Sequence, residues 1–121
     1  MLQEHATVTN HFAIVADDEL VGGIGIDPFD DERRYVAHIG YWLGRPFWGR
    51  GIATAACGAL TEFALGERGF VRLETSVYAP NVASMRVLEK CGYVREGFMR
   101  KAVFKRGEVL DAYLYAKTSS G

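Results

Sequence analysis

The chain has 121 residues, which is enough for one modest hydrophobic core and predicts a single domain. Apolar residues make up 49% of the chain and charged residues 24%, which excludes a disordered or fibrous protein. The formal net charge of -1 argues against partners attracted by bulk charge, so neither nucleic acid nor a membrane surface is expected.

Three strands are predicted in the first part of the chain. Apolar residues in 12–15 and 20–26, on either side of an acidic turn at residues 17–19, predict a hairpin. Residues 27–34 contain a proline and several acids, and they predict a solvated loop. Residues 35–43 alternate and predict a third strand. On it Ala37, Ile39, Tyr41 and Leu43 face one way, and Val36, His38, Gly40 and Trp42 face the other.

The second part of the chain alternates helices and strands. Residues 52–67 carry apolar side chains at helical spacing, which predicts a helix. A strand is predicted over residues 70–78, and a second helix runs to Cys91 with Asn81 as its N-cap. Further strands are predicted over residues 93–98, 102–105 and 109–117. The order β-β-β-α-β-α-β-β predicts an α/β (α+β) fold, a mixed and mostly antiparallel sheet around a central parallel strand-helix-strand unit.

The stretch GRPFWGRGIATAACGAL, residues 44–60, places glycines and arginines at the start of the first helix. A helix start leaves N–H groups unsatisfied and carries a partial positive charge, so phosphate is a natural ligand there. Gly49 and Gly51 let the backbone approach such a ligand, and Arg45 and Arg50 can bond its oxygens. The stretch lacks the G-K-[ST] of a P-loop and the third glycine of the dinucleotide fingerprint. It predicts a different kind of phosphate site, with an ordinary strand-to-helix turn as the alternative.

These residues also resemble a known family. GYWLGRPFWGRGIATAACGAL is similar to the coenzyme signature of the GNAT superfamily of acetyl-CoA-dependent N-acyltransferases, [RQ]-x-x-G-x-[GA], which falls on residues 48–53. Trp48 departs from the first position of that pattern. NVASMRVLEKCGYVREG resembles N-x-x-S-x-x-V-L-x-K-x-G-[FY]-x-x-E-G of the branch containing ribosomal-protein N-terminal acetyltransferases (RimJ/RimL-like), and AVFKRGEVLDAYLYA resembles its closing hairpin. The similarity runs from about residue 12 to residue 116.

The resemblance implies an acyltransferase that moves an acetyl group from acetyl-CoA to a primary amine, either a protein N-terminus or a small molecule. The amine attacks the thioester directly in a ternary complex, and no metal takes part. In the family, loop amides hold the coenzyme pyrophosphate, and the pantetheine arm runs between two splayed parallel strands. The implied coenzyme-binding residues are Trp42, Leu43, Trp48, Gly49, Arg50, Gly51, Ile52, Ala53, Thr54 and Asn81.

Three residues are candidates for the chemistry of the transfer. Ser84, in an otherwise apolar helical stripe, is the candidate acid for the departing thiolate, with helix packing as the alternative. The tyrosine that many superfamily members carry four residues later is replaced by Leu88. His38 and Glu74, on neighbouring predicted strands, are the candidate bases; a hydrogen-bonded histidine and a salt-bridged carboxylate are the alternatives. Val103 occupies a position where some members of the branch carry a glutamate.

Two features bear on compartment and assembly. Cys57 and Cys91 lack metal-ligand spacing, and the N-terminus resembles no signal peptide, so reduced thiols and a cytoplasmic location are expected. The superfamily fold opens with a strand and two helices before the hairpin, whereas eleven residues precede Phe12 here. Three accounts follow: an N-terminally shortened domain, a homodimer whose partner completes the acceptor wall, or a coenzyme A-binding module or assembly subunit with little or no transferase activity.

Overall fold

The computed structural model describes residues 2–4 and 10–120. Strands and helices follow in the order β1 (Leu2–Glu4), β2 (His11–Ala16), β3 (Glu19–Pro28), β4 (Val36–Leu43), α1 (Ile52–Gly66), β5 (Arg72–Tyr78), α2 (Val82–Lys90), β6 (Val94–Lys105) and β7 (Glu108–Thr118). Short 3-10 turns at Asp31–Arg33 and Arg45–Phe47 flank β4. Within the described ranges, neither helix has the length and apolar character needed to cross a membrane.

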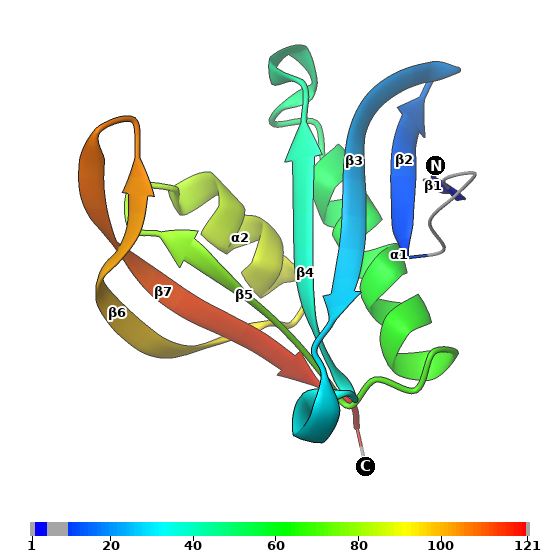
Figure 1. Ribbon diagram of the computed structural model, residues 1–121. Coiled ribbons are helices and arrows are strands. Elements are labelled where there is room, and N and C mark those ends of the chain that lie inside the picture. The colour runs from blue at the N-terminus through cyan, green and yellow to red at the C-terminus, as the bar shows by residue number, and fades with distance from the viewer. Residues whose placement is uncertain (1, 5–9, 121) are drawn as a thin grey trace.

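All the strands form one sheet of seven in the order β1-β2-β3-β4-β5-β7-β6. Among the strands that the structure describes, β4 and β5 alone pair in parallel, over Val36–His38 and Arg72–Glu74, and every other neighbouring pair is antiparallel. Beyond these three residues β4 and β5 diverge, so the sheet opens into a V whose arms are visible in Figure 1. The mixed sheet and its central parallel unit are as the sequence predicts.

Both helices lie against the same face of the sheet (Figure 1). Helix α1 buries a stripe of residues against β3, β4 and β5, and α2 packs beside it. The core so formed contains Ile14, Ile24, Ile26, Ile39, Ala56, Leu60, Ala64, Leu73, Leu88 and Tyr115. The helices cover one face of the sheet. The opposite face of β2, β3 and β4 remains open, because several side chains on it are short.

Two details of the strands differ from the expectation. The structure adds the short strand β1, and it joins the two predicted strands 93–98 and 102–105 into the single strand β6. The register of β6 on β7 shifts between Met99 and Val103, where Lys101 takes a positive φ of 52°. The Lys101 N–H donates to Asp111 Oδ1 at 2.9 Å, so a side chain satisfies the backbone group that the bulge removes from the ladder.

Candidate active site

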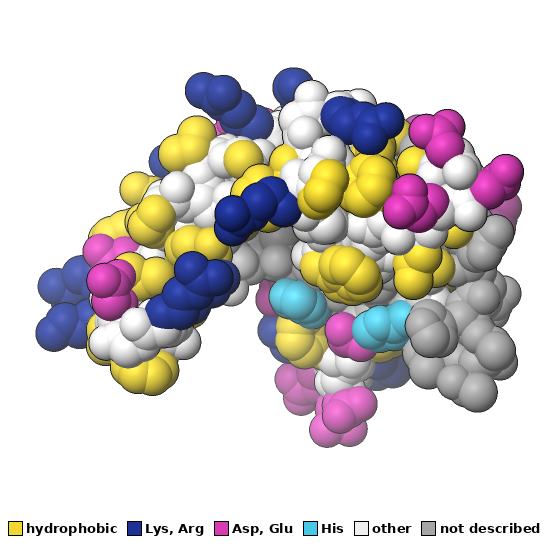
Figure 2. Space-filling model, turned by 90° about the horizontal axis from the view of Figure 1, so that it is seen from above, with side chains coloured by type: hydrophobic (Ala, Val, Ile, Leu, Met, Phe, Trp, Pro, Cys, Tyr) yellow, Lys and Arg dark blue, Asp and Glu magenta, His cyan; other side chains and the backbone are white. Residues whose placement is uncertain are grey.

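A cavity of about 520 Å³ lies where β4 and β5 diverge, between the loop that precedes α1 and the first turns of α2. In Figure 2, which views the molecule from above Figure 1, a hollow separates the lobe of the β6–β7 hairpin from the main body, and Lys and Arg side chains lie along its margin. The lining residues are Tyr41, Trp42, Leu43, Phe47, Trp48, Gly49, Gly51, Ile52, Ala53, Thr54, Tyr78, Asn81, Ala83, Ser84, Arg86, Val87 and Lys90. These include every residue expected to bind coenzyme A except Arg50.

The loop before α1 presents backbone N–H groups to the cavity. Gly49 and Gly51 have φ of 75° and 77°, in the left-handed region that side chains disfavour, and Gly51 is the N-cap of α1. The first bond of the helix runs from the Ala55 N–H to the Gly51 carbonyl at 3.0 Å. The amides between these two residues therefore precede the intrahelical ladder, at the positive end of a helix of 15 residues. This geometry suits a phosphate or pyrophosphate group.

Aromatic side chains brace the same loop. Trp48 Nε1 donates to the Leu43 carbonyl at 2.8 Å, which ties the loop back to the end of β4. The Arg45 guanidinium lies 5.5 Å from the Trp48 ring centroid, and that of Arg50 lies 5.6 Å from the Phe47 ring. Both arginines thus lie against the rings of residues that line the cavity, Trp48 and Phe47.

Polar groups from β4 and α2 meet on the opposite wall. Asn81 Oδ1 accepts from the Ser84 N–H at 3.2 Å, which is the N-cap bond predicted for this helix. The Ser84 hydroxyl lies 3.1 Å from the Tyr41 hydroxyl. Burial is the main cause that raises the pKa of Tyr41, against the opposing effect of the Ser84 hydrogen bond, so the phenol stays protonated through the neutral range. Two neutral hydroxyls therefore face the cavity beside the N-terminus of α2.

The edges of β4 and β5 that face the cavity are unpaired beyond His38 and Glu74, the last residues of the parallel ladder. On their other sides, β4 pairs with β3 and β5 pairs with β7. Backbone N–H and C=O groups along the divergent part of each strand can therefore bond an extended ligand that enters the gap. A narrow chain with amide groups fits this slot best.

The two candidate bases lie at the vertex of the V, outside the cavity lining. Glu74 accepts from Arg72 Nε at 2.7 Å and from Arg33 Nη2 at 2.9 Å. Burial acts to raise the pKa of Glu74, but the two guanidinium groups outweigh it and hold that pKa below its usual value. Glu74 is thus the salt-bridged carboxylate of the alternative interpretation. His38 Nε2 lies 3.5 Å from Thr75 Oγ1, and its ring is half-buried without a charged partner among the described contacts.

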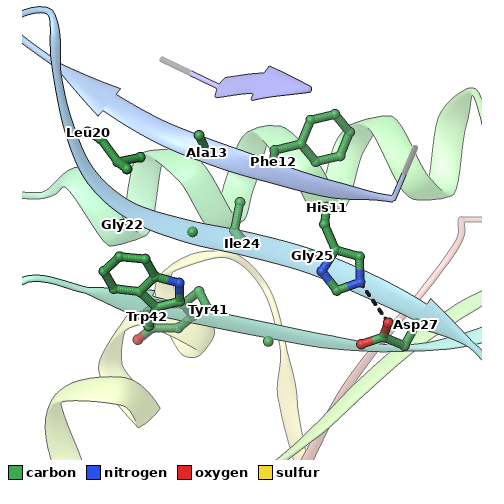
Figure 3. A pocket seen from close by; sticks show the side chains of 12 residues that line it. His11, Phe12, Ala13, Leu20, Gly22, Ile24, Gly25, Asp27, Tyr41 and Trp42 are labelled. Carbon is green, nitrogen blue, oxygen red and sulfur yellow. Dashed lines mark hydrogen bonds and ion pairs between the residues drawn. The ribbon is translucent and has the colours of Figure 1, made fainter. Parts of the chain in front are cut away.

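A second cavity of about 410 Å³ lies on the open face of β2, β3 and β4 (Figure 3). Two rings lie flat over cross-strand glycines: the Trp42 indole over Gly23, and the His11 imidazole over Gly25. His11 Nε2 is 2.8 Å from Asp27 Oδ1. A Cβ at Gly40, which also lines this cavity, would lie 3.3 Å from His38 Cε1, so His38 shares the open face.

The two cavities adjoin. Tyr41 and Trp42, consecutive residues of β4, line both of them. Side chains on the two faces of one strand therefore border the divergent gap on one side and the open face on the other. A ligand in the gap and a second ligand on the open face can therefore approach each other at Tyr41 and Trp42.

Sequence reasoning missed two tyrosines of the larger cavity. Tyr41 was predicted to share a strand face with Ile39 and Leu43, and in the structure its hydroxyl pairs with that of Ser84. Tyr78 ends β5 next to the helix cap, and its hydroxyl accepts from Lys105 Nζ at 3.3 Å. A signal existed for Tyr41, because a tyrosine among apolar strand residues requires a hydrogen-bond partner for its hydroxyl.

Comparisons with known proteins agree with this geometry. Residues 1–94 match a family model described as an acetyltransferase (GNAT) domain. Over 109 residues the chain is 31% identical to a Bacillus licheniformis protein named N-acetyltransferase p20, which covers 88% of this chain and 61% of that protein. It is 30% identical over 102 residues to the L-amino acid N-acetyltransferase AaaT of Escherichia coli, covering 84% of this chain and 63% of AaaT.

Solved structures give the same result. The chain superimposes on Mycobacterium smegmatis RimJ in complex with CoA-disulfide with a TM-score of 0.82 and 30% identity, covering 91% of this chain and 54% of RimJ. In these comparisons the chain spans between about half and two thirds of the length of its relatives.

Proposed function

The chain belongs to the GNAT acetyltransferase family, and from this premise we propose that it transfers the acetyl group of acetyl-CoA to a primary amine. The single observation that carries the proposal is the glycine-capped start of α1, which opens into the cavity beside two diverging parallel strands. The positive φ of Gly49 and Gly51 serves to aim consecutive amides at one point, as an anion ligand requires.

The coenzyme would lie across the cavity with its pyrophosphate on the amides of residues 49–54. Arg50, Arg86 and Lys90 supply cations around that point, the latter two from the cavity wall. The amide-bearing pantetheine arm would run between β4 and β5 and bond their unpaired edges. This arrangement directs the thioester toward the vertex of the V, near Ser84 and His38.

The reaction then needs an amine without its extra proton and a stabilised leaving group. The nitrogen attacks the thioester carbonyl, a C–N bond forms, the C–S bond breaks, and sulfur leaves with the electron pair. Ser84 donates a hydrogen bond to that thiolate, and the N-terminus of α2 adds a favourable dipole. His38 takes the proton from the amine, directly or through water, and the thiolate is finally protonated to the free thiol.

The acceptor would approach over the open face, where Gly40 leaves room beside His38 and the His11 ring covers the neighbouring Gly25. A carboxylate such as Glu74 is a poorer base for this purpose, because its two guanidinium partners keep its pKa low. Two relatives support small amines and peptide N-termini as the acceptor classes to test: the L-amino acid N-acetyltransferase AaaT, and a Bacillus subtilis protein named putative ribosomal N-acetyltransferase YdaF.

Two measurements on the same protein test the proposal. Calorimetric titration with coenzyme A should give a saturable isotherm, and Gly51→Glu, which puts a negative side chain at the N-cap, should abolish it. Release of free thiol from acetyl-CoA should then be measured with free amino acids, a polyamine, and alanine- and serine-initiated peptides. His38→Gln should lower the rate roughly a hundredfold without changing coenzyme binding.

The outcomes separate the enzyme from a binding module. Amine-dependent thiol release that Gly51→Glu abolishes supports the acetyltransferase. Coenzyme binding without release for every acceptor class would support the module instead, and absence of binding at millimolar coenzyme would refute both.

A further inference from the structure

We propose that Tyr41 is a positioning residue for acetyl transfer: its phenol donates to Ser84 Oγ and thereby aims the serine hydroxyl hydrogen at the sulfur of the departing thiolate. The inference rests on the proposed function, since it assumes that the thioester lies in the gap between β4 and β5. It assigns a role to a residue of β4 that stands 43 positions from Ser84 in the chain.

The hydroxyls of Tyr41 and Ser84 form a pair across the cavity. Tyr41 and Ser84 come from the two walls of the same cavity, and their hydroxyl oxygens are 3.1 Å apart. Each hydroxyl has one hydrogen, and the bond between them uses one of the two. One O–H therefore remains available to the cavity, held in place by its partner rather than free to rotate.

The acidities of the two hydroxyls indicate the direction of the hydrogen bond between Tyr41 and Ser84. A phenol is the stronger acid and the better donor, while an aliphatic hydroxyl oxygen is a good acceptor, so Tyr41 donates and Ser84 accepts. The serine hydrogen is then directed into the cavity, and the bond from Tyr41 polarises it. Because burial keeps the phenol protonated, Tyr41 remains a donor at every pH at which the enzyme would work.

The residue one helical turn after Ser84 offers the thiolate no alternative hydrogen-bond donor. Leu88, one helical turn after Ser84, is buried in the core at 2% exposure and has no polar atom to offer. Ser84 lies in the first turn of α2, where the partial positive charge of the helix start is strongest. The one hydroxyl hydrogen that the pair leaves free therefore lies where an anion is already favoured.

The experiment follows the thiol of bound coenzyme A, so no acceptor is needed. Ultraviolet absorbance of the thiolate is titrated against pH for the saturated complex, with the complex of a coenzyme analogue that lacks sulfur as the blank. We expect the bound thiol of the wild type to have a pKa about one unit below the ~8.5 of a free thiol. Tyr41→Phe and Ser84→Ala should each remove most of this shift, and the double variant should lose no more than either single variant.

The controls isolate the hydroxyl pair from the other charges of the cavity. Arg86 and Lys90 remain in every variant, so their effect on the thiol cancels in the comparison. Tyr35→Phe removes the hydroxyl of an exposed tyrosine outside the cavity and should leave the thiol pKa unchanged. The midpoint temperature of thermal unfolding should stay close to that of the wild type. The coenzyme dissociation constant at pH 6, where the thiol is neutral, should stay within twofold of the wild-type value.

Each outcome decides between the proposals. A bound thiol whose pKa is unshifted in the wild type, a Tyr41→Phe complex that keeps the shift, or additive losses in the double variant would overturn the role of the pair. A loss of affinity with the shift retained would make Tyr41 a packing residue. Failure of the wild type to bind coenzyme A would refute the proposed function itself, a result seen in the calorimeter before any titration.

Discussion

Gly51 combines two roles in one residue, because it is both the N-cap of α1 and part of the wall of the larger cavity. A Cβ there would meet no atom within 4 Å, so its φ of 77° and not lack of space demands glycine. The strain of a side chain in this region is roughly 1 kcal/mol. The loop would relieve it by rotating, which would turn the amides away from their common target.

Gly51→Ala should therefore lower the free energy of unfolding by about 1 kcal/mol and weaken coenzyme A binding by about tenfold. Urea denaturation and calorimetric titration measure the two effects. Gly58→Ala is the matched control: Gly58 lies inside the same helix, the nearest atom to its added Cβ is Cys91 Sγ at 4.0 Å, and alanine should stabilise the protein slightly. Equal coenzyme affinity in the two variants would contradict the role given to Gly51.

At this scale the sequence was informative where function depends on neighbouring residues. Gly49 and Gly51 before an apolar helix predicted a loop whose backbone can approach a ligand, and the structure adds that both residues have a positive φ. The Tyr41–Ser84 bond could not be predicted, since it depends on how far β4 and α2 approach across the gap. A salt-bridged Glu74 was one of the alternatives for this residue, but its pairing with Arg33 could not be predicted, because Arg33 comes from a loop 41 residues earlier.

Among the elements, β5 is tied to its surroundings through Glu74 and Arg72. Glu74 bonds Arg33 of the loop before β4, and Arg72 reaches Glu96 of β6 at 2.8 Å. The network crosses the vertex of the V, where β4 and β5 are paired over only three residues. It therefore fastens the two halves of the sheet at the point where the ladder is shortest.

Glu74→Gln should lower the free energy of unfolding at pH 7 by roughly 1 kcal/mol, because it removes a half-buried carboxylate from two guanidinium groups. The folded pKa of Glu74 lies below its unfolded value, so its contribution is complete above the unfolded pKa of about 4.3 and is lost as the pH falls through the folded pKa. The difference between variant and wild type should persist at pH 5 and shrink below about pH 4. A difference independent of pH would show that packing, not charge, is responsible.

Strand β3 approaches β4 closely through adjacent glycines with different surroundings. An added Cβ at Gly22 would collide with the Trp42 carbonyl oxygen and lie 3.1 Å from Leu43 Cα, both backbone atoms. At Gly23 the nearest atom is Trp42 Nε1 at 2.6 Å, the end of a side chain that is 60% exposed and can swing away.

Gly22→Ala should therefore cost about 3 kcal/mol of stability, whereas Gly23→Ala should cost about 1 kcal/mol or less. Chemical denaturation of the two variants makes the comparison. Because they differ by one position on the same strand, they serve as controls for each other, and similar losses would refute the assignment of the contacts.

The elements were predictable where apolar periodicity was clear, which holds for both helices and for β2 to β5. The sequence divided β6 in two because polar and charged residues around Lys101 interrupt the alternation. In the structure a bulge stabilised by Asp111 carries the strand through that interruption. Such a bulge depends on a residue of the next strand. The residue pattern of one strand alone therefore does not predict it.

In the whole molecule, the two arms of the sheet are joined by a short parallel ladder and by the helices packed across it. A ligand that bonds both edges of the gap would connect the arms directly, so binding should stabilise the molecule as a unit. Cys57 reports on this stability. It is fully buried on α1, and burial is the main cause that raises the pKa of its thiol to about 12.

Because Cys57 is inaccessible and protonated at pH 8, an aromatic disulfide reagent should modify it only after α1 leaves the sheet. If that opening destroys the coenzyme cradle, which begins at the first residue of α1, a coenzyme analogue that lacks the thiol, and so cannot react with the reagent, should lower the modification rate by the factor 1 + [analogue]/Kd, about a hundredfold at a hundred times Kd. The measurement uses Cys91→Ala, which removes the half-buried second thiol. The analogue should have no effect in Gly51→Glu combined with Cys91→Ala. Labelling at the same rate with and without the analogue would mean that α1 opens locally without disturbing the cradle at its start. Immediate labelling of the native site would contradict the burial of Cys57.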